Sequence, residues 1–163
     1  MTIENETIAT YFRHNLWANV RLFEVCAHLS DEQLDASVTG GYGSIRDTMQ
    51  HIVNSERSYL QRITTGQPYR RPQGAPPLTM AEMQDSIRTS GEGFIVAAPN
   101  VQAQDSVTVD REGTPRSVPS TILLTQAINH ATEHRAQITA VLTHLGVEPP
   151  SLDGWTYFDS RDS

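Results

Sequence analysis

Apolar side chains recur along most of this chain at the three- and four-residue spacing of helices that bury one face. The pattern predicts helices over residues 6–29, 44–65, 79–97 and 119–145. The third range is the least regular, because Gly91 and Gly93 fall inside it and glycine disfavours helix. The apolar stripes of these helices are expected to face a common core.

Residues that favour helix ends agree with these ranges. Ser44 can cap the start of the second helix, and Gly66 can end it. Pro119 suits the first turn of the fourth helix. Residues 30–33 and 79–82 have the form of capping boxes, which predict a short helical turn and the start of the third helix.

The connecting segments predict loops and one hairpin. Residues 66–78 are rich in proline and glycine, which is typical of a loop. Val107 and Val109 alternate with polar residues, and residues 111–114 resemble a turn, so a small β-hairpin is expected between residues 105 and 119. The C-terminal tail is expected to be irregular, with its aromatic side chains folding back onto the helices. These side chains are Trp155, Tyr157 and Phe158.

Together the elements predict an all-α fold, a four-helix bundle with a small β-hairpin before the last helix, in a single domain over residues 1–163. A chain of this length can bury a core without disulfides, and none can form because Cys26 is the only cysteine. Cys26 falls on an apolar stripe and is expected to be a small buried side chain. The first residues do not resemble a signal peptide, and no apolar run has membrane-spanning length, so a cytoplasmic protein is expected.

Charge narrows the choice of partner. The net charge is −7, and every positive side chain is an arginine because the sequence contains no lysine. No segment carries a basic stripe, which argues against nucleic acid and anionic membranes as partners. A small-molecule substrate is the remaining expectation.

Two histidines on the last helix are candidate metal ligands. His130 and His134 lie four residues apart, so they share one face of the helix, and that face is the apolar stripe. Burying two imidazoles costs free energy unless both find partners. A metal would satisfy both, and two hydrogen-bonded core histidines are the alternative.

A third histidine would complete a metal site. His51 on the second helix is the best candidate by position, although it lies roughly 130° from the centre of its apolar stripe. His14, His28 and His144 are poorer candidates, because they flank an apolar segment or lie near a helix end. Three neutral imidazoles suit zinc, nickel, copper or iron(II) and leave positions open for water or substrate.

Polar residues at core positions need an explanation. Asn15, Asn19 and Glu56 project onto apolar stripes of their helices. They could orient the histidines or contact a substrate. Alternatively, they form a buried hydrogen-bonded network with an arginine such as Arg13 or Arg57.

A peptidase motif competes with this interpretation. Residues 130–134 match the H-x-x-E-H pattern of inverzincins, in which Glu133 would be the general base. Such enzymes also need a carboxylate ligand further along the chain. The available carboxylates outside the predicted helices are Glu148, Asp153 and Asp159.

Several segments resemble the DinB-like superfamily of metal-binding four-helix bundles. Residues 11–23 (YFRHNLWANVRLF) are similar to its first helix, and residues 44–59 (SIRDTMQHIVNSERSY) to its second. Residues 129–138 (NHATEHRAQI) are similar to its H-x-x-x-H-R-x-Q-I signature, and residues 145–150 (LGVEPP) to its usual ending. The resemblance covers nearly the whole chain.

This resemblance implies that His51, His130 and His134 bind one divalent metal (zinc, nickel or iron) with positions open for water or substrate. It also implies a thiol-dependent transferase or isomerase that uses a low-molecular-weight thiol such as mycothiol or bacillithiol, often as a homodimer. The alternatives are a hydrolase that uses a metal-bound water and a stress-response protein that binds metal without turnover. Fold alone does not decide among them.

Overall fold

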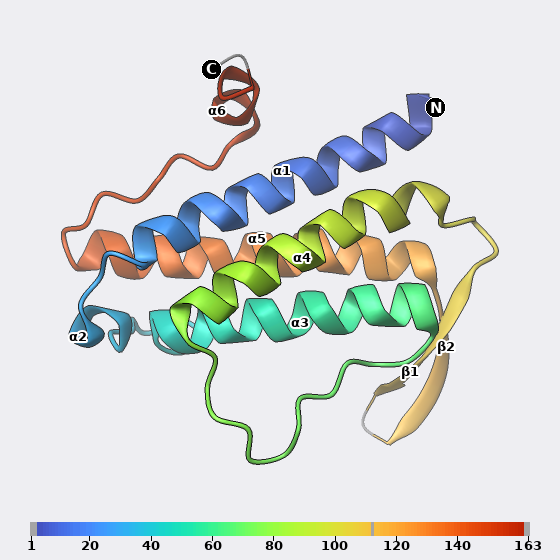
Figure 1. Cartoon of the computed structure of the whole chain (residues 1–163), viewed down its shortest axis with the longest axis horizontal. Helices are drawn as coiled ribbons and strands as arrows, with labels where there is room; N and C mark the ends of the chain where they lie inside the picture. Colours follow the sequence, from blue (N-terminus) through green and yellow to red (C-terminus); the bar gives the residue numbers. More distant parts are fainter. Residues whose placement is uncertain (1–2, 112, 162–163) are drawn as a thin grey trace.

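Four long helices dominate the structure, a computed structural model that describes residues 3–111 and 113–161 (Figure 1). They are α1 (Ile3–Cys26), α3 (Ile45–Thr65), α4 (Met80–Ala97) and α5 (Ser120–His144). Helices α1 and α3 each contact both α4 and α5, so the four helices lie side by side around a common interior. The four predicted helices are therefore present.

The interior contains the apolar stripes that the sequence predicts. One cluster includes Phe23, Met49 and Ile138, from three different helices. A second lies around Phe12 and Phe94, whose rings stack with centroids 4.8 Å apart. Buried apolar area drives folding in proportion to its extent, so these clusters hold the helices that carry the candidate residues.

Local sequence signals place most helix ends correctly. Ser44 caps α3, and Gly66 ends it in the left-handed conformation, with φ 74°. The two predicted capping boxes form, with Ser30 starting the short α2 (Asp31–Leu34) and Thr79 starting α4. Helix α1 ends at Cys26 rather than at residue 29, and Pro119 precedes α5 as its N-cap.

Gly91 and Gly93 lie inside α4 without breaking it. A Cβ at Gly91 would lie 2.6 Å from Leu16 Cδ1 on α1, and a Cβ at Gly93 would lie 2.5 Å from Leu60 Cδ2 on α3. The glycines let both neighbours approach α4 closely, so packing outweighs their low helix propensity.

The segment after α4 contains the predicted hairpin. A 3-10 helix (Ala98–Asn100) leads into β1 (Ser106–Arg111), which pairs antiparallel with β2 (Thr114–Pro119). Part of the predicted turn, Glu112, lies outside the described residues. Arg62 of α3 donates to the Thr108 carbonyl at 3.0 Å and ties the hairpin to the long helices.

The C-terminal tail is not wholly irregular, because it contains α6 (Gly154–Asp159). Asp153 nucleates this helix by accepting hydrogen bonds from two backbone N–H groups. Tyr157 packs against His14 and Trp17 of α1, as the sequence predicts. The prediction is wrong for Trp155 and Phe158, which are 82% and 57% exposed.

Candidate metal centre

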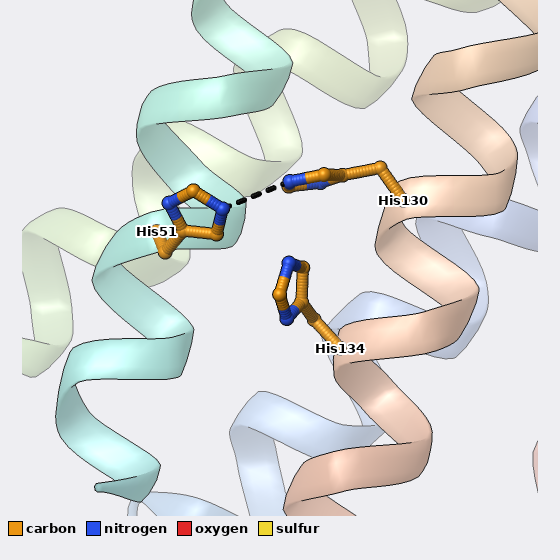
Figure 2. A group of neighbouring side chains, drawn as sticks. All are labelled: His51, His130 and His134. Carbon is orange, nitrogen blue, oxygen red and sulfur yellow. Dashed lines mark hydrogen bonds between the residues drawn. The ribbon is translucent and has the colours of Figure 1, made fainter. Parts of the chain in front are cut away.

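Two neighbouring helices bring three imidazoles together. His51 projects from α3, and His130 and His134 project from α5 into the space between the helices (Figure 2). One nitrogen from each ring lies within 4.8 Å of those of the other two. We call these three residues the histidine cluster. Among the described residues it is the one group of histidine, cysteine or acidic side chains close enough together to share a metal ion.

The position of His51 follows from how α3 packs. A helix in this arrangement contacts two neighbours, and α3 lies against both α4 and α5. Its apolar stripe faces the interior, so a residue on the flank of the stripe can face one neighbour. His51 faces α5 in this way, which is why a residue far from the stripe centre joins the cluster.

Hydrogen bonds orient the rings. His134 Nδ1 lies 2.8 Å from Gln137 Oε1 one turn further along α5. An amide oxygen only accepts, so Nδ1 carries a proton, and in the neutral ring Nε2 presents its lone pair. His51 Nε2 and His130 Nε2 lie 2.9 Å apart. His130 Nδ1 is buried and has no hydrogen-bond partner among the described residues.

Burial favours the neutral form of two rings in the cluster, His51 and His130. Desolvation, with a smaller effect from His134, lowers the pKa of His51. Desolvation and the two neighbouring imidazoles lower the pKa of His130 to about 4. Neutral imidazole is the form that binds metals, so both rings are available as ligands at neutral pH.

Tyr42 forms an aromatic wall beside the cluster. Its ring stacks on His51 with centroids 4.1 Å apart and planes 20° apart, and it meets the His134 ring edge-on. Tyr42 lies in the glycine-containing segment before α3, about half exposed to solvent. No periodicity marks such a loop residue, so the sequence analysis did not identify it.

The donor set fits a divalent metal. Three imidazole nitrogens converge from two neighbouring helices, and a hydrogen bond to Gln137 orients the His134 ring. Metal-binding histidines characteristically have this second hydrogen bond on the other ring nitrogen. Three nitrogens leave a tetrahedral ion one position for another ligand, which is the form of a catalytic site.

The other histidines take no part in the cluster. His14 Nε2 lies 2.8 Å from the Leu152 carbonyl oxygen and fastens the tail to α1. His28 and His144 are exposed. These positions agree with their lower ranking in the sequence analysis.

The peptidase interpretation finds no support in the geometry. Glu133 is exposed on α5, and it does not belong to the group of potential metal ligands. The carboxylates predicted as possible extra ligands are likewise outside that group among the described residues. The H-x-x-E-H pattern here reflects two histidines one helical turn apart, with the glutamate exposed to solvent.

The polar residues predicted at core positions form a buried network of their own. Glu56 Oε1 accepts hydrogen bonds from Asn15 and Asn19 at 2.9 and 2.7 Å, and Oε2 accepts one from Ser90 at 3.1 Å. Arg135 Nη1 donates to the side-chain oxygens of both asparagines at 2.7 Å. We call these five residues the buried polar network.

The arginine in this network is not one of those named from the sequence. Arg13 pairs with Glu6, and Arg57 lies over the ring of Tyr69. Arg135 instead extends from α5 directly after His134, and its position one residue on turns it toward α1. Burial lowers the pKa of Arg135 to about 10. Its guanidinium therefore stays charged at neutral pH.

Cys26 is fully buried in the core, as expected. Burial raises the pKa of its thiol to about 12, so it is not a reactive thiolate at neutral pH. No helix in the described part of the chain is both long and apolar enough to cross a membrane.

Fold and site together define a mainly helical protein in which two neighbouring helices carry a three-histidine group that could hold a metal ion. The sequence profile of the DinB family matches residues 1–162, so the chain belongs to the DinB family. The family predicted from the sequence is thereby confirmed.

A solved structure supports the same fold. The crystal structure of a DinB-like protein from Bacillus cereus ATCC 10987 is similar with a TM-score of 0.64. The match covers 90% of this chain and 95% of that chain, at 20% sequence identity, and at this identity it shows the fold alone. No curated protein matches the sequence at a significant level.

Proposed function

We propose that this chain is a single-domain four-helix bundle that binds one divalent metal through His51, His130 and His134 and acts as a thiol-dependent transferase or isomerase. The main support for the metal site is the convergence of three imidazole nitrogens within 4.8 Å of one another. Membership of the DinB family supports the thiol chemistry.

A metal bound here would lower the pKa of a thiol and hold it as a nucleophilic thiolate. The chain's own residues orient and protect that site. Gln137 holds His134 in one tautomer, and the Tyr42 ring covers one face of His51. The thiol must come from outside the chain, because Cys26 is the only cysteine and its pKa is raised to about 12.

A hydrolase is the weaker proposal. It needs a general base beside the metal, and Glu133, the candidate from the sequence, is exposed and outside the cluster. A protein that binds metal without turnover shares the same site. It is distinguished only by the absence of any reaction in the fully metal-loaded protein.

Metal content per chain tests the ligand set. Untagged wild-type protein is expected to contain about one metal per chain, because three ligands converge on one point. His51→Ala, His130→Ala and His134→Ala are each expected to lose it while remaining helical, because the core supplies the folding energy. His28→Ala and His144→Ala are matched controls, since both histidines are exposed.

Loss of metal from the three cluster variants with retention in both controls supports the proposal. Stoichiometric metal in any one cluster variant would remove that histidine from the ligand set. Thiol-dependent transfer assays on the metal-loaded protein, with mycothiol and bacillithiol as thiols, then test the activity. Sedimentation of the same samples tests the expected homodimer.

A further inference from the structure

The ring of His51 has no hydrogen bond to any described residue outside the histidine cluster. Its one hydrogen bond joins its Nε2 to His130 Nε2 at 2.9 Å. A metal held by these two nitrogens would replace that bond. His134 differs, because Gln137 holds its ring from outside the cluster. The orientation of His51 in a metal-bound protein must therefore come from a contact of another kind.

Tyr42 makes such a contact. Its ring stacks on His51 with centroids 4.1 Å apart and planes 20° apart, and it meets the His134 ring edge-on at 5.1 Å and 79°. Stacked and edge-to-face pairs are the arrangements that aromatic rings favour. One side chain thus contacts candidate ligands from both α3 and α5. A large rotation of the His51 ring would break the stacked contact.

The backbone on either side of Tyr42 is held without help from the cluster. The Gly41 N–H donates to the Val38 carbonyl at 3.1 Å, within the segment that precedes α3. The Ile45 N–H donates to the Ala36 carbonyl, also at 3.1 Å. These hydrogen bonds fix the loop against the start of α3, so the ring of Tyr42 is carried by an ordered backbone.

The same loop crosses α3 one turn before His51. A Cβ on Gly43 would lie 3.3 Å from Asp47 Cβ, which is a tighter contact than most Cβ atoms make. Glycine at this position lets the loop lie directly on the first turn of the helix. Asp47 and His51 are four residues apart and share one face of α3. Tyr42, the residue before Gly43, is thereby placed over His51.

The hydroxyl of Tyr42 takes no part in this arrangement. It makes no hydrogen bond within residues 3–111 and 113–161, and the side chain is 52% exposed. The ring alone makes the two contacts with the cluster, so phenylalanine would make them equally well. Because the side chain is half exposed, its loss is expected to cost the fold little.

We propose that Tyr42 is a positioning residue of the metal centre, whose ring holds the His51 imidazole with Nε2 facing the histidines of α5. This inference rests on the proposed function for the metal itself. A ligand that is already held in its binding orientation loses less conformational freedom when the metal binds, which strengthens the affinity. Tyr42 acts on His51 through ring contact, as Gln137 acts on His134 through a hydrogen bond.

Metal affinity in two variants of Tyr42 tests this role. Competition with a chromophoric chelator gives the dissociation constant for zinc, and the absorption spectrum of the cobalt(II)-loaded protein reports the ligand geometry. Tyr42→Leu removes the ring and is expected to bind zinc about three- to tenfold more weakly, as the loss of one aromatic pair allows. Tyr42→Phe keeps the ring and is expected to match wild type in both measurements.

Tyr11→Leu is the matched control. Tyr11 is 57% exposed on α1 and does not belong to the cluster, so its loss is expected to leave zinc affinity unchanged. Urea unfolding of the metal-free proteins separates positioning from folding, and Tyr42→Leu is expected to unfold like Tyr11→Leu. Weaker zinc binding in Tyr42→Leu alone, at unchanged metal-free stability, supports the proposal.

The contrary outcomes are distinct. Equal zinc affinity in Tyr42→Leu and wild type overturns the positioning role and leaves the three-histidine ligand set standing. An equal loss in Tyr42→Phe would assign the effect to the hydroxyl, and an equal loss in Tyr11→Leu would make it unspecific, so either result overturns the role. A matching loss of metal-free stability in Tyr42→Leu does the same. Wild-type protein that binds no metal overturns both this inference and the proposed function.

Discussion

The histidine cluster joins α3 and α5, and the buried polar network joins all four long helices, yet the two groups are organised in opposite ways. In the network, Glu56 accepts three hydrogen bonds and Arg135 donates to both asparagines. In the cluster, His130 Nδ1 is buried without a partner among the described residues, and His51 Nε2 and His130 Nε2 share one hydrogen bond at 2.9 Å.

The difference distinguishes a group of residues that stabilises the fold from a group that can bind a ligand. A satisfied buried network holds helices in register. A buried site with unused lone pairs has a cost that an exogenous group can remove. The sequence places polar residues on apolar stripes in both regions, and only the partners of each side chain distinguish the two.

The largest expected effect is the loss of Arg135. Arg135→Met leaves the Glu56 carboxyl buried without its counter-charge and removes both hydrogen bonds to the asparagines. The free energy of unfolding of the metal-free protein is expected to fall by about 3–5 kcal/mol, as when one partner of a buried pair is removed. Urea unfolding followed by circular dichroism measures it.

Arg46→Met provides the control for that substitution. Arg46 pairs with Asp31 and Asp35 on the surface, so its loss is expected to cost less than about 1 kcal/mol. Equal costs for the two arginines would show that the buried polar network contributes no more to stability than a surface ion pair.

The sequence predicts most of the fold because the relevant signals are local. Helix periodicity and capping residues depend on neighbours within a few positions, and the caps at Ser30, Ser44 and Thr79 form as predicted. Local rules are least informative where long-range contacts determine the structure. The helix over 79–97 was the least regular of the four in the sequence, and it forms because α1 and α3 pack closely against Gly91 and Gly93.

The candidate site is predictable only in part for the same reason. The i, i+4 spacing of His130 and His134 predicts two neighbouring rings directly. Bringing His51 to them depends on the packing of α3 against α5, and here the resemblance to the family contributed more than helix geometry. Arg135 and Tyr42 were missed because their roles depend on tertiary contacts with α1 and with His51.

The next effect in size concerns how the cluster is held. Gln137→Ala removes the acceptor for His134 Nδ1–H and frees the ring to change tautomer and orientation. Metal affinity is expected to fall about 10–100-fold, with little change in the stability of the metal-free protein. Competition with a chelator measures the affinity. Gln126→Ala, at an exposed position on the same helix, is expected to leave it unchanged.

Weaker metal binding in Gln137→Ala at unchanged stability would contrast with Arg135→Met, which is expected to lower the stability of the fold. An affinity unchanged in Gln137→Ala would mean that the hydrogen bond does not orient His134 in the metal-bound protein. Lower stability of the metal-free variant, comparable to Arg135→Met, would mean that the cluster serves the fold as the network does.

The smallest expected effect is a pH dependence of the metal-free protein. Burial lowers the pKa of His130 from 6.5 to about 4. Between these values the unfolded chain takes up a proton that the folded chain does not, so the free energy of unfolding falls as pH decreases through this window. Well above pH 6.5 both states are neutral at this ring, and this loss of stability is absent. Urea unfolding at a series of pH values within the window measures the slope.

His130→Gln is expected to reduce this slope, because it removes the titrating ring while keeping a polar side chain in the same place. His28→Gln should leave the slope unchanged, since His28 is exposed. Identical slopes in wild type and His130→Gln would mean that His130 takes up its proton as readily in the folded protein as in the unfolded chain. The conclusion that desolvation holds His130 neutral in the folded protein would then be wrong.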